Sequence, residues 1–152
     1  MQTVMAGIAT LVATLAVGVV IGLILKRRDG RMRAVEHAPV TSGDLGADLG
    51  ERATLVQFST AFCQPCRATR RILGEVAGMV PGVRHVEIDA ESRLDLVRRF
   101  DVLRTPTVLV LDAAGNVVKR ASGQPRKVDV IAALGLAVDG ASHEPSHPSD
   151  KV

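Results

Sequence analysis

The feature that most constrains this 152-residue chain is an apolar segment near its start, Val4–Leu25, which contains no charged side chain. As a helix it would be about 33 Å long, enough to cross the hydrocarbon core of a bilayer. A cleaved signal peptide is the main alternative, but such peptides have a positively charged start and a shorter apolar run. This chain begins with MQT. We therefore predict a short N-terminus (1–3) and a transmembrane helix (4–25).

The charges after this segment predict its orientation. The stretch KRRDGRMR (26–33) carries five of the positive residues, and the rest of the chain is close to neutral. Positive residues beside a membrane helix favour the cytoplasmic side. We expect a single-pass cell-membrane protein with its N-terminus outside and its soluble part in the cytoplasm. With three Phe and no Trp or Tyr, a base-stacking surface and a nucleic-acid partner are not expected.

Small residues recur every fourth position along the apolar segment, and Gly18 with Gly22 forms a GxxxG pattern. This pattern lets two membrane helices approach closely, so it predicts a possible dimer through Gly18 and Gly22. The alternative is that membrane helices are simply rich in small residues.

The remaining residues predict one small α/β domain. A polar, basic juxtamembrane tether (26–42) leads to a domain (43–138), and a polar, Pro-containing tail (139–152) is expected to be disordered. Helical patterns separate and follow the strand-like segments, one of them with Ser92 and Asp95 spaced as in a capping box. A helical crossover makes the first two strands parallel, and a Gly-containing turn makes the last two a hairpin. We expect a small mixed sheet with helices on both faces, its strands at 53–58, 83–88, 107–112 and 116–121.

The only two cysteines, Cys63 and Cys66, lie in FCQPCR, between a predicted strand and a predicted helix. A helix N-terminus carries a partial positive charge and free N–H groups, which stabilise a thiolate. Cys63 could then attack a substrate disulfide, and Cys66 could resolve the mixed disulfide. Pro65 suits the first turn of such a helix.

Two other interpretations of the cysteines remain open. A structural zinc site needs four ligands, and beyond this pair the chain offers only histidines, two of them in the tail: His37, His85, His143 and His147. The cysteines could also be structural, although a CxxC after a strand usually indicates redox chemistry. We expect no metal.

From about Asp44 to Val138 the sequence resembles the thioredoxin family, through LVQFSTAFCQPC, VEIDAE, FDVLRTPTVLVLDAAGNVV and SGQP. The resemblance implies a thioredoxin-like fold with Cys63 as the exposed nucleophile and Cys66 as the buried resolving cysteine. It implies that Pro106 is a cis proline facing the disulfide, and that the backbone of Thr105 pairs with the substrate chain. Gly123 matches a family glycine near the site, and no bound cofactor is needed. The implied substrate-binding residues are Phe62, Gln64, Pro65, Thr105, Pro106 and Gly123.

Several positions depart from the typical family pattern. Phe62 and Gln64 replace the Trp and Gly of Trp-Cys-Gly-Pro-Cys, and Gln57 replaces a buried Asp thought to help deprotonate the second cysteine. His85 replaces a nearby lysine, and its simplest interpretation is a strand residue facing solvent. Arg71 replaces a helix-kinking proline. These changes predict a divergent, specialised member.

Taken together, the sequence predicts a membrane-tethered thiol–disulfide oxidoreductase that reduces protein disulfides. Its expected partners are membrane lipid, membrane-associated protein substrates, and a thiol reductant or reductase as electron donor. One alternative is an extracytoplasmic oxidoreductase that serves cytochrome c maturation or disulfide formation and isomerisation. The other is a non-catalytic binding module that keeps the fold as a scaffold.

Overall fold

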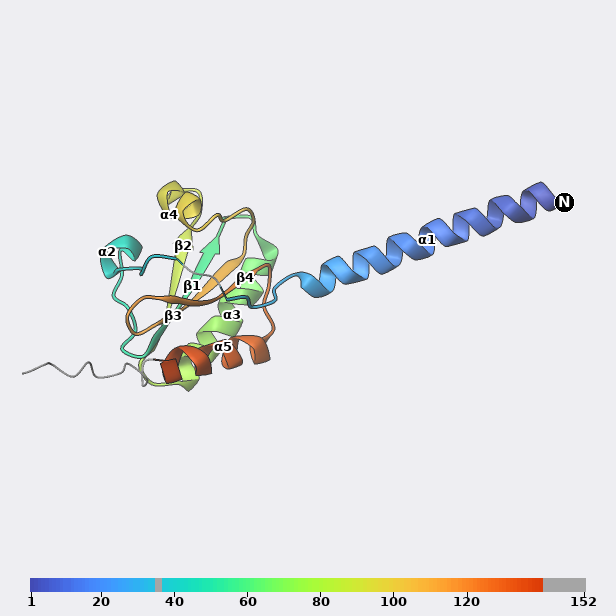
Figure 1. Cartoon of the computed structure of the whole chain (residues 1–152). Coiled ribbons are helices and arrows are strands. Elements are labelled where there is room, and N and C mark those ends of the chain that lie inside the picture. The colour runs from blue at the N-terminus through green and yellow to red at the C-terminus, as the bar shows by residue number, and fades with distance from the viewer. Residues whose placement is uncertain (35–36, 141–152) are drawn as a thin grey trace, which may run out of the picture.

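The computed structural model describes residues 1–34 and 37–140. Within them, a long N-terminal helix projects from a small α/β domain (Figure 1). The elements in chain order are α1 (Gln2–Arg28), α2 (Ser42–Leu45), β1 (Ala53–Ser59), α3 (Gln64–Met79), β2 (Val83–Asp89), α4 (Leu94–Arg99), β3 (Thr107–Asp112), β4 (Val117–Ser122) and α5 (Lys127–Gly140).

The four strands form a mixed sheet in the order β2-β1-β3-β4. β1 pairs in parallel with β2, whereas β1–β3 and β3–β4 are antiparallel. Every residue of β1 is buried, as expected for a central strand that is covered on both faces. The predicted parallel pair and hairpin are confirmed.

Alternate residues of each central strand point to opposite faces of the sheet, so the core has two halves. Leu55 of β1 belongs to the half covered by α3 and α5, and Phe58 belongs to the half covered by α2, α4 and the loops around them. Helices therefore cover both faces of the sheet, as predicted.

α1 has 27 residues, contains the segment predicted to span a membrane, and buries none of its residues. By length and composition it can cross a bilayer. Its last turn contains Lys26, Arg27 and Arg28.

The segment after α1 lies along the edge of the sheet. The N–H of Gly30 donates to the carbonyl of Ser122 at 2.7 Å, and Arg33 and Arg120 exchange two backbone hydrogen bonds at 2.6 and 2.7 Å. Farther along, Val40 is buried in the core and its N–H donates to the carbonyl of Gly115. Much of the expected tether is therefore packed against the domain.

Two predictions remain to be compared with the structure: the capping box before α4 and the disordered C-terminal tail. The predicted capping box of Ser92 and Asp95 is wrong, because α4 begins at Leu94 without a side-chain cap. Asp95 instead forms an ion pair with Arg93 at 3.1 Å. The tail is predicted to be disordered from residue 139 to residue 152. Residues 139 and 140 belong to α5, and residues 141–152 lie outside the described residues.

Candidate active site

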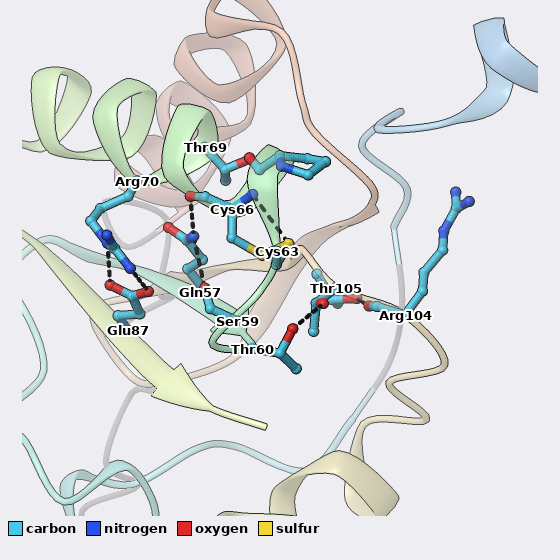
Figure 2. The surroundings of a disulfide bond; sticks show 12 residues. Gln57, Ser59, Thr60, Cys63, Cys66, Thr69, Arg70, Glu87, Arg104 and Thr105 are labelled. Atoms are coloured by element: carbon cyan, nitrogen blue, oxygen red, sulfur yellow. Dashed lines mark hydrogen bonds and ion pairs between the residues drawn. A yellow bond between two sulfur atoms is a disulfide. The ribbon is translucent and has the colours of Figure 1, made fainter. Parts of the chain in front are cut away.

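Cys63 and Cys66 form a disulfide with an S–S distance of 2.02 Å at the start of α3 (Figure 2). Cys63 is the N-cap of this helix, and its sulfur accepts a hydrogen bond from the backbone N–H of Cys66 at 3.2 Å. Cys63 is half-buried, whereas Cys66 is only 1% exposed. An external thiol therefore reaches the sulfur of Cys63 more easily than that of Cys66.

The turn between β1 and α3 places the pair at the helix end. The N–H of Cys63 donates to the carbonyl of Thr60 at 3.4 Å, and Pro65 lies in the first turn of the helix, where no N–H is required. The hydroxyl of Thr69 donates back to the carbonyl of Pro65 at 2.9 Å. The beginning of α3 is thus defined by local sequence.

A second loop lies in the surroundings of the disulfide. The Thr105–Pro106 bond is cis, as predicted. The hydroxyls of Thr105 and Thr60 lie 3.2 Å apart, and the N–H of Gly123 donates to the carbonyl of Pro106 at 2.7 Å. The fold thus brings this loop, Gly123 and the β1–α3 turn together.

The implied substrate-binding residues surround one surface recess or border the disulfide. Pro65, Thr105, Pro106 and Gly123 line the recess. Phe62 is 97% exposed and stands in the turn beside Cys63. Gln64 is exposed between the cysteines.

The side chain of Gln57 lies behind Cys66, where it is fully buried and carries no ionisable group. Its amide nitrogen donates to the hydroxyl of Ser59 and to the carbonyl of Cys66, both at 2.9 Å. Its amide oxygen lies 3.2 Å from Nε2 of His85. The prediction that His85 faces solvent is wrong, because the register of β2 turns this half-buried ring toward Gln57.

An ion pair joins α3 to the edge strand β2. Arg70 of α3 donates two hydrogen bonds to the carboxylate of Glu87, at 2.5 and 2.6 Å. The Arg70 guanidinium lowers the pKa of Glu87, partial burial opposes this, and the Ser59 hydroxyl lowers it further. Burial lowers the pKa of His85, and the negative charge of Glu87 partly offsets that effect. His85 is therefore held in its neutral form to lower pH than a free histidine.

Sequence reasoning missed the contacts made by charged residues around the site. Arg104, next to Thr105, forms an ion pair with Asp29 at 2.5 Å and donates to the carbonyl of Ser122 at 3.1 Å. Asp29 and Lys26 line the same recess as Pro106. Nothing in the sequence pattern signals these long-range pairs.

Among residues 1–34 and 37–140, no group of three or more His, Cys, Asp or Glu side chains is placed to hold a metal ion. His143 and His147 lie outside the described residues.

Comparison with known proteins points to one family. The family model described as Thioredoxin matches residues 42–135, more than half of the chain. Thioredoxin from Staphylococcus saprophyticus is 26% identical over 89 residues, which cover 58% of this chain and 86% of the relative. Thioredoxin H5 from Oryza sativa is 26% identical over 72 residues, covering 47% of this chain and only 53% of the relative.

Solved structures support the fold. Chloroplastic thioredoxin z superposes with a TM-score of 0.54 at 22% identity, covering 69% of this chain and 96% of that one. The oxidised form of mitochondrial thioredoxin 3 from Saccharomyces cerevisiae gives a TM-score of 0.50 at 19% identity, covering 56% and 78%. At such identities the likeness concerns the fold alone. Together with the match of the family model, it shows that this chain belongs to the thioredoxin family.

Proposed function

We propose that this protein is a membrane-anchored thiol–disulfide oxidoreductase that reduces protein disulfides with the Cys63–Cys66 pair. The observation that carries the proposal is a disulfide whose first cysteine is half-buried and caps a helix, while its second cysteine is fully buried. That asymmetry separates an attacking cysteine from a resolving one. The match of the family model to residues 42–135 supports the same class of activity.

The proposed reaction has two exchange steps. In the reduced protein, the Cys63 thiolate attacks one sulfur of a substrate disulfide, and the other substrate sulfur leaves as a thiolate. The Cys66 thiolate then attacks the Cys63 sulfur, which re-forms the intramolecular disulfide and releases the second substrate thiol. Two electrons pass to the substrate, and two protons taken up from solvent balance its thiols. A second thiol protein or a reductase returns the electrons.

The surroundings would assist these steps in two ways. The N–H of Cys66, which contacts the Cys63 sulfur at 3.2 Å, would stabilise negative charge on that sulfur. We assign substrate binding to the exposed rim formed by Phe62 and Gln64 and to the recess lined by Pro65, Thr105, Pro106 and Gly123. The neutral amide of Gln57 cannot act as a base at neutral pH, so we expect the Cys66 thiol to lose its proton to water.

We further propose that α1 anchors the protein in the cell membrane with the domain in the cytoplasm. Support comes from the length and apolar composition of α1 and from the positive residues that follow it. An impermeant thiol reagent added to intact, reduced cells should leave Cys63 unlabelled. Labelling would place the domain outside and favour the extracytoplasmic alternative. Dimerisation through Gly18 and Gly22 stays a prediction.

The decisive measurement is the reduction potential of the full-length protein in a mild detergent, by equilibration with glutathione or dithiothreitol. A reductant should lie near the value of about −270 mV that is typical of thioredoxin, and a value near −120 mV would indicate an oxidant instead. A Cys66→Ser protein should trap a mixed disulfide with a disulfide-containing peptide, whereas Cys63→Ser should not. Full cellular function of Cys63→Ser would favour the non-catalytic alternative.

A further inference from the structure

The end of the membrane helix and the substrate recess share one wall. Lys26 lies in the last turn of α1, and Asp29 follows the helix directly. Both line the recess that also contains Thr105 and Pro106. The segment that leaves the membrane is therefore part of the surface a substrate would meet.

Backbone contacts fix this arrangement. Gly30 donates to Ser122, and Arg33 pairs with Arg120 in an antiparallel bridge. These bonds extend the edge of the sheet beyond β4. The domain is thereby attached to the helix end by a structured segment and not by a free chain.

Two further features hold the segment in place. Gly30 is buried with φ of +73°, and an added Cβ would collide with the backbone of Gln124, so only glycine fits without rearrangement. Asp29 forms an ion pair with Arg104, the residue that precedes Thr105. Figure 2 shows Arg104 and Thr105 as neighbours on this loop, with the Arg104 guanidinium extended away from it.

These contacts would keep the recess at a fixed, short distance from the membrane surface. The uncharged part of α1 ends at Leu25, so Lys26 would lie among the lipid headgroups. In that placement only the residues from Lys26 to Asp29 would separate the bilayer from the recess, which Thr105 and Pro106 also line. The membrane surface would then close one side of the recess and hold it at headgroup level.

We propose that the substrates are membrane proteins whose reactive disulfide lies in a juxtamembrane segment, within a few residues of a transmembrane helix. This inference rests on the proposed function and names the substrate class of the same site. The Cys63 thiolate forms a mixed disulfide with one substrate sulfur and expels the other, and the Cys66 thiolate then completes the exchange. What the anchor adds is a high local concentration of such disulfides at the recess.

The test uses the full-length, reduced protein in nanodiscs of phosphatidylcholine with two model substrates. Each is a single transmembrane peptide with an intramolecular disulfide, placed about 3 residues from the helix or beyond a stiff helical spacer of about 25 residues, roughly 37 Å long. A neutral lipid is chosen because Arg31, Arg33 and Lys119 lie close to the helix end and would attract anionic headgroups. A soluble peptide with the same disulfide reports intrinsic reactivity.

The matched variant carries about 30 flexible Gly/Ser residues between Arg28 and Asp29, which adds a reach of about 30 Å while leaving Asp29–Arg33 free to dock on the domain. The anchored protein should reduce the near disulfide about tenfold faster than the distant one, and the insertion should bring that ratio below about twofold. Both proteins should reduce the soluble peptide, and the rate of each protein on it is the reference to which its other two rates are normalised.

Three other results would contradict either the inference or the proposed function. Equal rates on the near and distant disulfides in the anchored protein would overturn the inference. A ratio that survives the insertion would overturn it as well, because the preference would not come from the short connection. Failure of both proteins to reduce the soluble peptide would instead refute the proposed oxidoreductase function.

Discussion

Replacing Gln57 with glutamate tests how the buried polar centre behind the disulfide is held together. The Gln57 side chain is fully buried, and its amide nitrogen donates to the Ser59 hydroxyl and the Cys66 carbonyl. A glutamate has nearly the same shape but lacks both N–H groups. The experiment is best made in a chain that also carries His85→Gln, since an imidazolium 3.2 Å away could otherwise neutralise the new carboxylate.

The magnitude follows from the contacts. The protonated acid keeps one of the two donated hydrogen bonds, so at pH 4 the loss should be about 1 kcal/mol. Burial raises the pKa of the new carboxyl group above its unfolded value of about 4.3. Because the folded pKa of this group lies above its unfolded pKa, its contribution to the free energy of unfolding is fully present below the unfolded pKa. That contribution is lost as the pH rises from the unfolded toward the folded pKa. The slope is about 1.36 kcal/mol per pH unit, so by pH 7 the additional loss approaches about 3.7 kcal/mol.

The assay is urea unfolding of the oxidised, full-length protein in a mild detergent between pH 4 and pH 8. Far-UV circular dichroism is the suitable signal because the chain contains no Trp or Tyr. Gln124→Glu in the same His85→Gln background is the matched control, since Gln124 is exposed. A loss of stability at Gln57 that is independent of pH, or a slope equal to that of the control, would refute the reasoning.

Three further predictions concern the segment after α1 and the edge strand. Gly30→Ala should destabilise the domain by about 1–3 kcal/mol in thermal unfolding, because its positive φ suits only glycine, whereas Gly43→Ala should change little. Glu87→Gln should cost no more than about 1 kcal/mol at pH 7, because its partner Arg70 is exposed and solvent screens the ion pair. The folded pKa of Glu87 is lowered, so its contribution is lost as the pH falls through that value, and urea unfolding of the variant should depend less on pH below about 4.5. His85→Gln should remove a loss of stability that begins as the pH falls below about 6.5, because the folded pKa of His85 is also lowered; an unchanged pH profile would contradict this.

Local patterns predicted the elements closely. The apolar runs predicted the four strands to within about one residue at each end, since burial on both faces requires such runs. The spacing of the cysteines and Pro65 placed the start of α3, because capping depends on neighbours along the chain. The cis bond before Pro106 followed from the resemblance to the family and could not have come from local pattern.

The errors and omissions share a different physical origin. The neighbours of a side chain on a strand depend on how that strand is aligned with the next one. The sequence around His85 therefore could not show whether its ring contacts solvent or Gln57. The Asp29–Arg104 and Arg70–Glu87 pairs join residues far apart in sequence, and surface charges offer many alternative partners.

By itself, the sequence determined that the first helix can enter a membrane, that a thioredoxin-like domain follows it, and that the two cysteines of that domain can form a pair. The first and third properties follow from composition and from contacts between near neighbours, whereas the thioredoxin-like fold followed from the resemblance to the family. Only the tertiary structure decided that Asp29 and Gly30 dock against the sheet edge and the loop of Arg104. That docking depends on an unpaired edge at β4 and on a glycine-sized gap beside Gln124, which exist only once the domain has folded.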